Sequence, residues 1–176
     1  MKQSIVKLFA LVFATLLIGT IANAQQATEV KILNQWLGYW ESDVVSKSSK
    51  WIPEGAQWSE KSEVKWISDR HMHMQLIKNG NDKQENVALQ RYNPKSKKYE
   101  LWTFNDSSGY YIGSWIEKSK TMIWKYIDFG VGITGEIVDK FTDVGKWQQT
   151  MIFKDKDGNI LLDMQVVRKR TKRQTN

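Results

Sequence analysis

The stretch Leu37-Gly38-Tyr39-Trp40 decides the fold that the sequence predicts. It places a Gly-x-Trp at the start of the first of many short, aromatic-rich segments, and Val166-Val167-Arg168 lies in the last of them. Between these two ends, alternating apolar and polar residues are interrupted by turn signals such as Asn79-Gly80 and Asp157-Gly158. The pattern predicts one antiparallel sheet that closes on itself, with the first strand beside the last.

The fold class predicted is all-β, a closed antiparallel up-and-down β-barrel of eight to ten strands with a short N-terminal helix. The helix is expected over Thr28 to Leu37, where Val30, Leu33 and Trp36 share one helical stripe that can pack across one end of the barrel. The expected strands are Tyr39–Ser46, Trp58–Ile67, Arg70–Lys78, Asn86–Tyr92, Tyr99–Phe104, Tyr110–Lys118, Thr121–Phe129, Ile133–Thr142, Lys146–Lys154 and Ile160–Lys169.

Residues 1–24 have the features of a secretory signal peptide: a basic start, an apolar run from Leu8 to Ile21 and an Ala22-Asn23-Ala24 close. The alternative is an uncleaved membrane anchor, but a bilayer span needs about 20 apolar residues and this run is shorter and interrupted. We therefore expect a signal peptide at 1–24, a lipocalin-like barrel domain at 25–170 and a basic C-terminal tail at 171–176. We also expect a periplasmic or secreted location.

The charge of the chain is concentrated at its ends. Removing Lys2 and Lys7 with the signal peptide lowers the formal net charge from +7 to +5, and the run from Arg168 to Arg173 carries five basic residues. The barrel body is then neutral, so we expect no nucleic-acid partner. Two roles remain open for the tail, a solubilising terminus or a weak contact with an anionic envelope surface. With no cysteine, the protein has no disulfides or thiol chemistry.

The sequence offers little for metal or cofactor chemistry. It lacks the Gly-x-Ser-x-Gly, His-Glu-x-x-His, Walker and dinucleotide motifs. His71 and His73 share one strand face, but they are the only histidines, and a closed metal site needs more ligands of the right type. Asp155-x-Asp157-Gly158 starts like a calcium loop but lacks a closing Glu in register, and it is interpreted as a hairpin turn. We expect no metal and no cofactor.

An enzyme stays possible as an alternative, although the protein is expected not to be one. It would need two polar groups that converge inside the barrel, such as Glu60 or Asp139 with Arg91. Surface charge is the simpler interpretation of these carboxylates, because no sequence pattern brings them together.

Aromatic residues give the clearest functional signal. Pairs at a spacing that places both members on one strand face occur on three successive segments, and they can fill the core, line an apolar pocket or form an external platform for stacking sugars. The residues proposed to bind a ligand are Trp66, Met74, Trp102, Trp115, Trp124 and Tyr126. The polar loop from Ser46 to Gln57 is either a lid, with Trp51 and Ile52 as its contacts, or a loose surface loop.

Gly38-Tyr39-Trp40 after a short helix, with Arg168 in the last strand, resembles the calycin superfamily, which includes lipocalins and fatty-acid-binding proteins. The resemblance implies that Arg168 packs over Trp40 as a cation–π plug at one end of the barrel. The segment from Leu89 to Trp115 is similar to a bacterial calycin-like family of unassigned function, with Gln90-Arg91 in place of a single Gly and Asn93 in place of Asp. These motifs mark a fold and carry no catalytic residues.

The function expected is an exported, lipocalin-like binding protein that holds a small hydrophobic or amphipathic molecule in its barrel. The alternatives are a structural or interaction barrel that binds envelope glycans or anionic surfaces, and an enzyme with a carboxylate-based site in the barrel mouth.

Overall fold

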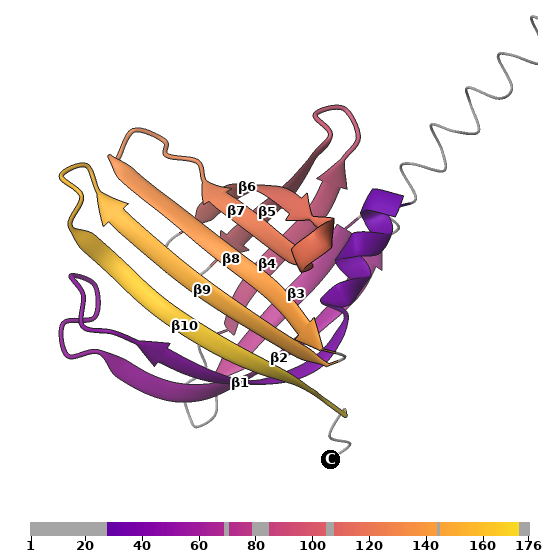
Figure 1. Cartoon of the computed structure of the whole chain (residues 1–176), viewed down its shortest axis with the longest axis horizontal. Coiled ribbons are helices and arrows are strands. Elements are labelled where there is room, and N and C mark those ends of the chain that lie inside the picture. Colours follow the sequence, from indigo (N-terminus) through magenta and orange to yellow (C-terminus); the bar gives the residue numbers. More distant parts are fainter. Residues whose placement is uncertain (1–27, 69–70, 79–84, 105–107, 144, 173–176) are drawn as a thin grey trace, which may run out of the picture.

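The computed structural model describes residues 28–68, 71–78, 85–104, 108–143 and 145–172 (Figure 1). The predicted signal peptide and the last four residues of the predicted tail lie outside these ranges. Among the described residues, no helix is long and apolar enough to cross a bilayer.

The described residues form ten strands, each close to one of the predicted segments. The sixth and seventh end earlier than predicted, because a short 3-10 turn, η2 (Glu117–Ser119), separates them and the chain leaves the sheet after Tyr126. The strands are β1 (Gly38–Ser46), β2 (Ala56–Ser68), β3 (His71–Lys78), β4 (Glu85–Asn93), β5 (Lys98–Phe104), β6 (Gly109–Ile116), β7 (Thr121–Tyr126), β8 (Ile133–Asp143), β9 (Lys146–Asp155) and β10 (Ile160–Thr171).

Each strand pairs with its neighbours in the sequence, always antiparallel, and β1 also pairs with β10. The prediction of an all-β, antiparallel fold with one short helix is confirmed. The strand pairing runs round a complete circuit, and the sheet curls with β8, β9, β10 and β1 across one side and β3 to β7 across the other (Figure 1). The barrel is not evenly filled, however, since one end is plugged and the other opens into a cavity described below.

The plugged end is covered by the N-terminal segment, as predicted. A helical turn over 28–32 continues into the 3-10 turn η1 (Leu33–Gln35). Leu33 and Trp36 are fully buried, and the Trp36 ring lies edge-on to Phe141 at 4.7 Å and to Trp147 at 6.1 Å. Such aromatic pairs contribute about 0.5–1.5 kcal/mol each beyond the area they bury.

Close packing in this half depends on Gly113 of β6. A Cβ atom built at Gly113 would lie 2.6 Å from the ring of Trp124, its cross-strand partner on β7. The absence of a side chain therefore lets the Trp124 indole pack directly against β6, where Trp124 is fully buried.

The predicted cation–π plug needs a correction. Arg168 does not pack over Trp40; its guanidinium Cζ lies 4.3 Å from the ring centroid of Trp147, while Arg170 lies 4.7 Å from that of Trp40. The reason is register: Trp40 is opposite Arg170, whereas Arg168 is opposite Ser42 on β1 and Trp147 on β9.

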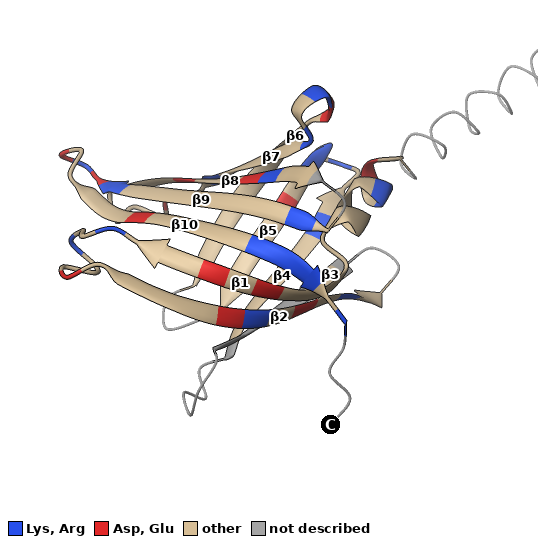
Figure 2. Ribbon diagram, turned by 60° about the horizontal axis from the view of Figure 1, so that its bottom comes forward, with Lys and Arg blue, Asp and Glu red and all other residues tan. Residues whose placement is uncertain are grey.

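The end of β10 also differs from the predicted strand, which stops at Lys169. The strand continues to Thr171. The Arg170 backbone N–H donates to the Gly145 carbonyl at 2.8 Å, and its guanidinium donates to the Gln35 carbonyl at 3.1 Å. Figure 2 shows this basic stretch of β10 beside acidic residues of β1, where Lys169 lies opposite Glu41.

Candidate ligand-binding site

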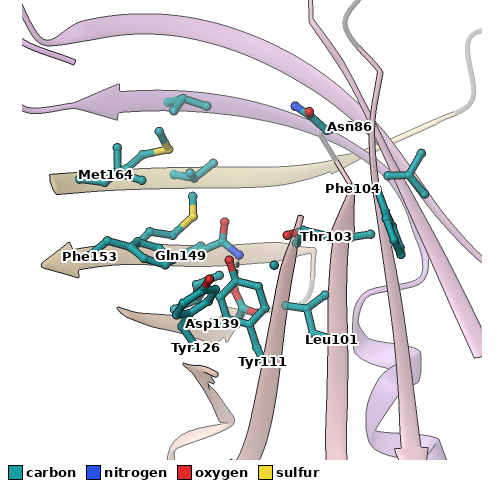
Figure 3. A pocket seen from close by; sticks show the side chains of 18 of the residues that line it. Asn86, Leu101, Thr103, Phe104, Tyr111, Tyr126, Asp139, Gln149, Phe153 and Met164 are labelled. Carbon is teal, nitrogen blue, oxygen red and sulfur yellow. Dashed lines mark hydrogen bonds between the residues drawn. The ribbon is translucent and has the colours of Figure 1, made fainter. Parts of the chain in front are cut away.

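A cavity of about 410 Å³ lies in the half of the barrel away from the N-terminal helix. That volume falls within the range of about 300–1,000 Å³ that small-molecule sites occupy. Most of its wall is apolar, and the residues that line it come from β1, β2 and β4 to β10 (Figure 3). The apolar residues that line it include Val44, Leu101, Tyr111, Tyr126, Ile137, Met151, Phe153, Leu162, Met164 and Val166.

Strand alternation explains which residues face the cavity. On β10 the inward set is Leu162, Met164, Val166 and Arg168, which follow the period of two of a strand. Gly135 of β8 makes room for one of the largest wall residues, because a Cβ atom there would lie 2.3 Å from the ring of Phe153. Phe153 therefore lies across its cross-strand partner and forms part of the wall.

A polar belt of four buried side chains, Glu60, Asp139, Gln149 and Arg168, also lines the cavity. The Arg168 guanidinium donates through Nη2 to Oε1 of Glu60 at 3.3 Å and through Nη1 to Oε1 of Gln149 at 3.1 Å. The Gln149 amide in turn donates to Oδ1 of Asp139 at 2.7 Å. Figure 3 shows Asp139 and Gln149 together at one side of the space, beside Tyr111. The belt is one connected network that spans β2, β10, β9 and β8.

Asp139 connects the belt to the filled half of the barrel. The Trp124 indole donates to its Oδ2 at 2.8 Å, and the Trp147 indole donates to its Oδ1 at 2.9 Å. Burial raises the pKa of Asp139, against the opposing effects of these hydrogen bonds and of Arg168. Burial also lowers the pKa of Arg168, while Glu60 and Asp139 favour its charged form.

Several inward-facing polar atoms have no hydrogen-bond partner within the described part of the chain. Four belong to cavity residues: Oε1 of Gln90, Oδ1 of Asn86, Nε1 of Trp58 and Nε of Arg168. The hydroxyls of Ser42 and Ser62, which are buried on β1 and β2, also lack a hydrogen-bond partner. An unpaired buried polar group costs roughly 1–3 kcal/mol, so these atoms form a hydrogen-bonding surface that the fold itself does not satisfy.

The loop between β1 and β2 reaches the cavity. Trp51 lines it and packs on Phe153 at a ring distance of 5.9 Å. The backbone N–H groups of Lys50 and Trp51 donate to the carbonyls of Ile160 and Leu161, which fixes the loop against the start of β10. This arrangement favours the lid interpretation for Trp51, whereas Ile52 does not line the cavity.

Of the six residues predicted to bind a ligand, Tyr126 lines the cavity. Trp124 lies in the filled half, as described above. Trp115 packs against Trp36 at 6.4 Å and donates to Oε2 of Glu117 at 2.6 Å, next to the helix. Trp66 lines a shallow hollow beside the helix and donates to Oδ1 of Asn34 at 3.0 Å.

Trp102 faces the outside of the barrel. It stacks on Tyr110 at 5.2 Å, and the guanidinium of Arg91 lies 5.1 Å from its ring centroid. The two neighbours of Trp102, Leu101 and Thr103, line the cavity instead. The side chain of Met74 lies outside the described residues, as do those of His71 and His73. Among the described residues, no group of His, Cys, Asp and Glu is arranged to hold a metal ion.

Sequence reasoning named Glu60 and Asp139 but interpreted them as surface charge, whereas both are buried, so it missed the polar belt. Glu60 shares the strand face of Val64, so its inward position could have been read from the alternation of β2. Arg91, named as its possible partner, instead faces outward and pairs with Glu100. The partner of Glu60 is Arg168, which is far away in the sequence. The hairpin interpretation of the 155–158 turn is confirmed, since Asp155 accepts hydrogen bonds from the backbone N–H groups of Asp157 and Asn159.

Comparison with known proteins supports the fold and leaves the family open. No protein-family model and no curated protein matches the sequence. Among solved structures, the chain is similar to Rv2717c from M. tuberculosis, with a TM-score of 0.60 and 11% identity over 81% of this chain and 97% of that one. It is also similar to the S-type phycobiliprotein lyase CPES from Guillardia theta, with a TM-score of 0.54 and 11% identity over 82% and 93%. At 11% identity, these two likenesses show a shared fold and nothing beyond it.

Proposed function

We propose that the protein is an exported, lipocalin-like binding protein that holds a small apolar or amphipathic molecule in its cavity. The observation that carries this proposal is the uneven filling of the barrel. Tryptophans pack one half solidly, while the other half keeps a cavity of about 410 Å³ with apolar walls and a polar belt. A barrel needed only as a rigid body would gain stability by filling this space, since buried apolar contacts are favourable.

The proposal includes the finer features that the sequence suggests. They are membership of the bacterial calycin-like family of unassigned function, removal of residues 1–24 and a periplasmic or secreted location. The lyase neighbour is named for an activity on phycobiliproteins, but at 11% identity that likeness supports the fold and not a substrate. Export is tested by the intact mass of the protein from its own host, which should correspond to a chain that starts at Gln25.

Native mass spectrometry of the protein purified from its own host tests ligand binding, because a retained molecule appears as added mass. The matched variants are Met151→Trp and Thr150→Trp, adjacent on β9. Met151 lines the cavity, whereas Thr150 is exposed on the outer face. We expect Met151→Trp to abolish the added mass and Thr150→Trp to keep it. No added mass in the wild type, together with no uptake of an uncharged apolar dye, would contradict the proposal.

A second candidate function, glycan binding on the outer surface, is favoured by one observation. Trp102, Tyr110 and Phe129 form an external stack, with ring distances of 5.2 and 6.5 Å, and Phe129 is 73% exposed. Exposed aromatic faces are used to stack sugar rings. Retention on immobilised envelope polysaccharide that is lost in Trp102→Ala and kept in Met151→Trp would favour this role over the cavity.

A further inference from the structure

The polar belt indicates what kind of molecule the cavity accepts. We propose that the ligand carries an uncharged hydrogen-bonding group, a hydroxyl or an amide, at the end that meets the belt, and that a carboxylate end is disfavoured. This inference rests on the proposed binding function and adds to it the chemistry of the ligand.

Arg168 is the obvious partner for an anionic ligand, but its charge is already matched. Its Nη1 and Nη2 groups donate to Gln149 and Glu60, and its guanidinium lies on the Trp147 ring. Of its three nitrogens, only the buried Nε lacks a hydrogen-bond partner. With a relative exposure of 2%, it has little freedom to turn toward a ligand. An incoming carboxylate would have to lose its own hydration and displace Glu60 from Arg168. Replacing one carboxylate by another at Arg168 gains nothing that offsets this cost.

The net charge of the groups that line the cavity also disfavours a carboxylate ligand. Among the described residues that line the cavity, the ionisable acids and bases are Glu60, Asp139 and Arg168. If Asp139 is protonated, the three groups sum to zero; if it is ionised, they carry one net negative charge. In neither state does the cavity hold a positive charge without a partner, and a like charge in a low-dielectric site is repelled.

The unpartnered atoms show what the cavity does offer. Oε1 of Gln90 and Oδ1 of Asn86 are acceptors that need a donor, whereas Nε1 of Trp58 and Nε of Arg168 are donors that need an acceptor. Gln90 is 2% exposed, so solvent at the surface does not satisfy it. A hydroxyl or an amide both donates and accepts, whereas an ionised carboxylate only accepts. An uncharged group can therefore pair with Gln90 and Asn86, and a carboxylate cannot.

The test uses two probes with the same apolar chain, 1-decanol and decanoate, which compete at pH 7 with the uncharged dye N-phenyl-1-naphthylamine. We expect decanol to displace the dye at a concentration at least about tenfold lower, which corresponds to one hydrogen-bonding mismatch of about 1.4 kcal/mol. Equal or tighter binding of decanoate would overturn the inference and leave the proposed function standing. If the dye itself does not bind, the proposed function fails as well.

A charge variant makes the test sharper. Glu60→Gln leaves Arg168 without its carboxylate partner, so the preference should shift toward decanoate by about tenfold or more. The double variant Glu60→Gln with Arg168→Met removes both charges and should restore the preference for decanol. Glu41→Gln, an exposed carboxylate on the outer face of β1, is the control that should leave the ratio unchanged.

If Glu60→Gln does not fold, Gln90→Leu replaces it. This variant removes the unpartnered acceptor with little change in volume, and it should weaken decanol relative to decanoate by about fivefold. Thermal melting confirms that each variant is folded before its ratio is measured. An unchanged ratio in the folded variant, Glu60→Gln or Gln90→Leu, would overturn the inference.

Discussion

Arg170 covers Trp40 at the plugged end of the barrel, with its guanidinium 4.7 Å from the centre of the indole ring. The two residues are cross-strand partners on β10 and β1, and Arg170 also donates to the Gln35 carbonyl of the N-terminal segment. One side chain thus joins the first strand, the last strand and the helix. The Trp40 indole itself donates to the Trp36 carbonyl at 2.7 Å, which also ties the first strand to the N-terminal segment from the inside.

Replacing Arg170 with Ala should destabilise the protein by about 0.5–1 kcal/mol, the size of an exposed cation–π contact. Chemical denaturation measures this as a lower free energy of unfolding. Lys169→Ala, one position away on the outer face, is the control and should stay within about 0.5 kcal/mol of the wild type. Equal losses in the two variants would show that Arg170 does not stabilise the plug.

Much of this architecture could be predicted from the sequence because its signals are local. Alternation along each strand and the turn residues between strands indicate an antiparallel sheet whatever the other strands do. The inward position of Arg168 follows from the same alternation. Its partners do not, because Trp147 and Glu60 face it only through the register of β10 with β9 and the closure of the sheet through β1.

The functional site was harder to predict for a related reason. On β5, both strand faces carry apolar residues, so the pattern alone does not show whether Trp102 or Leu101 faces inward. The aromatic pairs at period two suggested Trp102, yet Leu101 and Thr103 line the cavity and Trp102 stacks outside on Tyr110. An aromatic residue in the sequence is equally consistent with a place in the core and with a place in a binding site. Whether a cavity remains depends on how far the side chains of the opposite wall fill the barrel, which no single strand shows.

The free energy of unfolding should depend on pH through the ionisation of the buried Asp139 carboxyl. Burial raises its pKa in the folded state above the ordinary value of about 3.9 for an unfolded Asp. The folded protein then binds more protons than the unfolded chain, so this group's contribution to the free energy of unfolding falls as the pH rises above about 4 and levels off beyond the folded pKa. We expect Asp139→Asn to lose this dependence.

The measurement is the free energy of unfolding of the wild type and Asp139→Asn between pH 4.5 and 8. The wild type should become less stable relative to the variant as the pH rises. Asp43→Asn, at an exposed position on β1, is the control for general charge effects. The opposite trend would mean that the hydrogen bonds from Trp124 and Trp147 outweigh burial and lower the pKa.

Trp51 should control how fast molecules leave the cavity. Its ring lines the cavity and is 50% exposed, so truncation removes a contact at the mouth without opening the core. In Trp51→Ala we expect an apolar dye to dissociate several-fold faster, with a free energy of unfolding within about 0.5 kcal/mol of the wild type. Stopped-flow fluorescence measures the rate, and Glu54→Ala in the same loop is the control. Identical dissociation rates in the two variants would show that the loop does not act as a lid.

The two halves of the barrel should respond differently to the same small substitution. At Gly113 an added methyl group would meet the Trp124 ring at 2.6 Å, and at Gly135 it would meet the Phe153 ring at 2.3 Å. Trp124 is fully buried and its indole N–H donates a hydrogen bond to Asp139, so the ring cannot move aside. Phe153 borders the cavity and can shift into it.

Gly113→Ala should therefore lower the free energy of unfolding by about 1–3 kcal/mol, the usual cost of overpacking a core. Gly135→Ala should cost less stability, but it should weaken dye binding because Phe153 moves into the space the dye occupies. Denaturant unfolding and dye titration on both variants give the comparison. If the barrel is divided into a filled half and a binding half, Gly113→Ala should lose more stability and Gly135→Ala should lose more dye binding. If Gly135→Ala binds dye as well as the wild type while Gly113→Ala does not, the binding site lies elsewhere in the molecule.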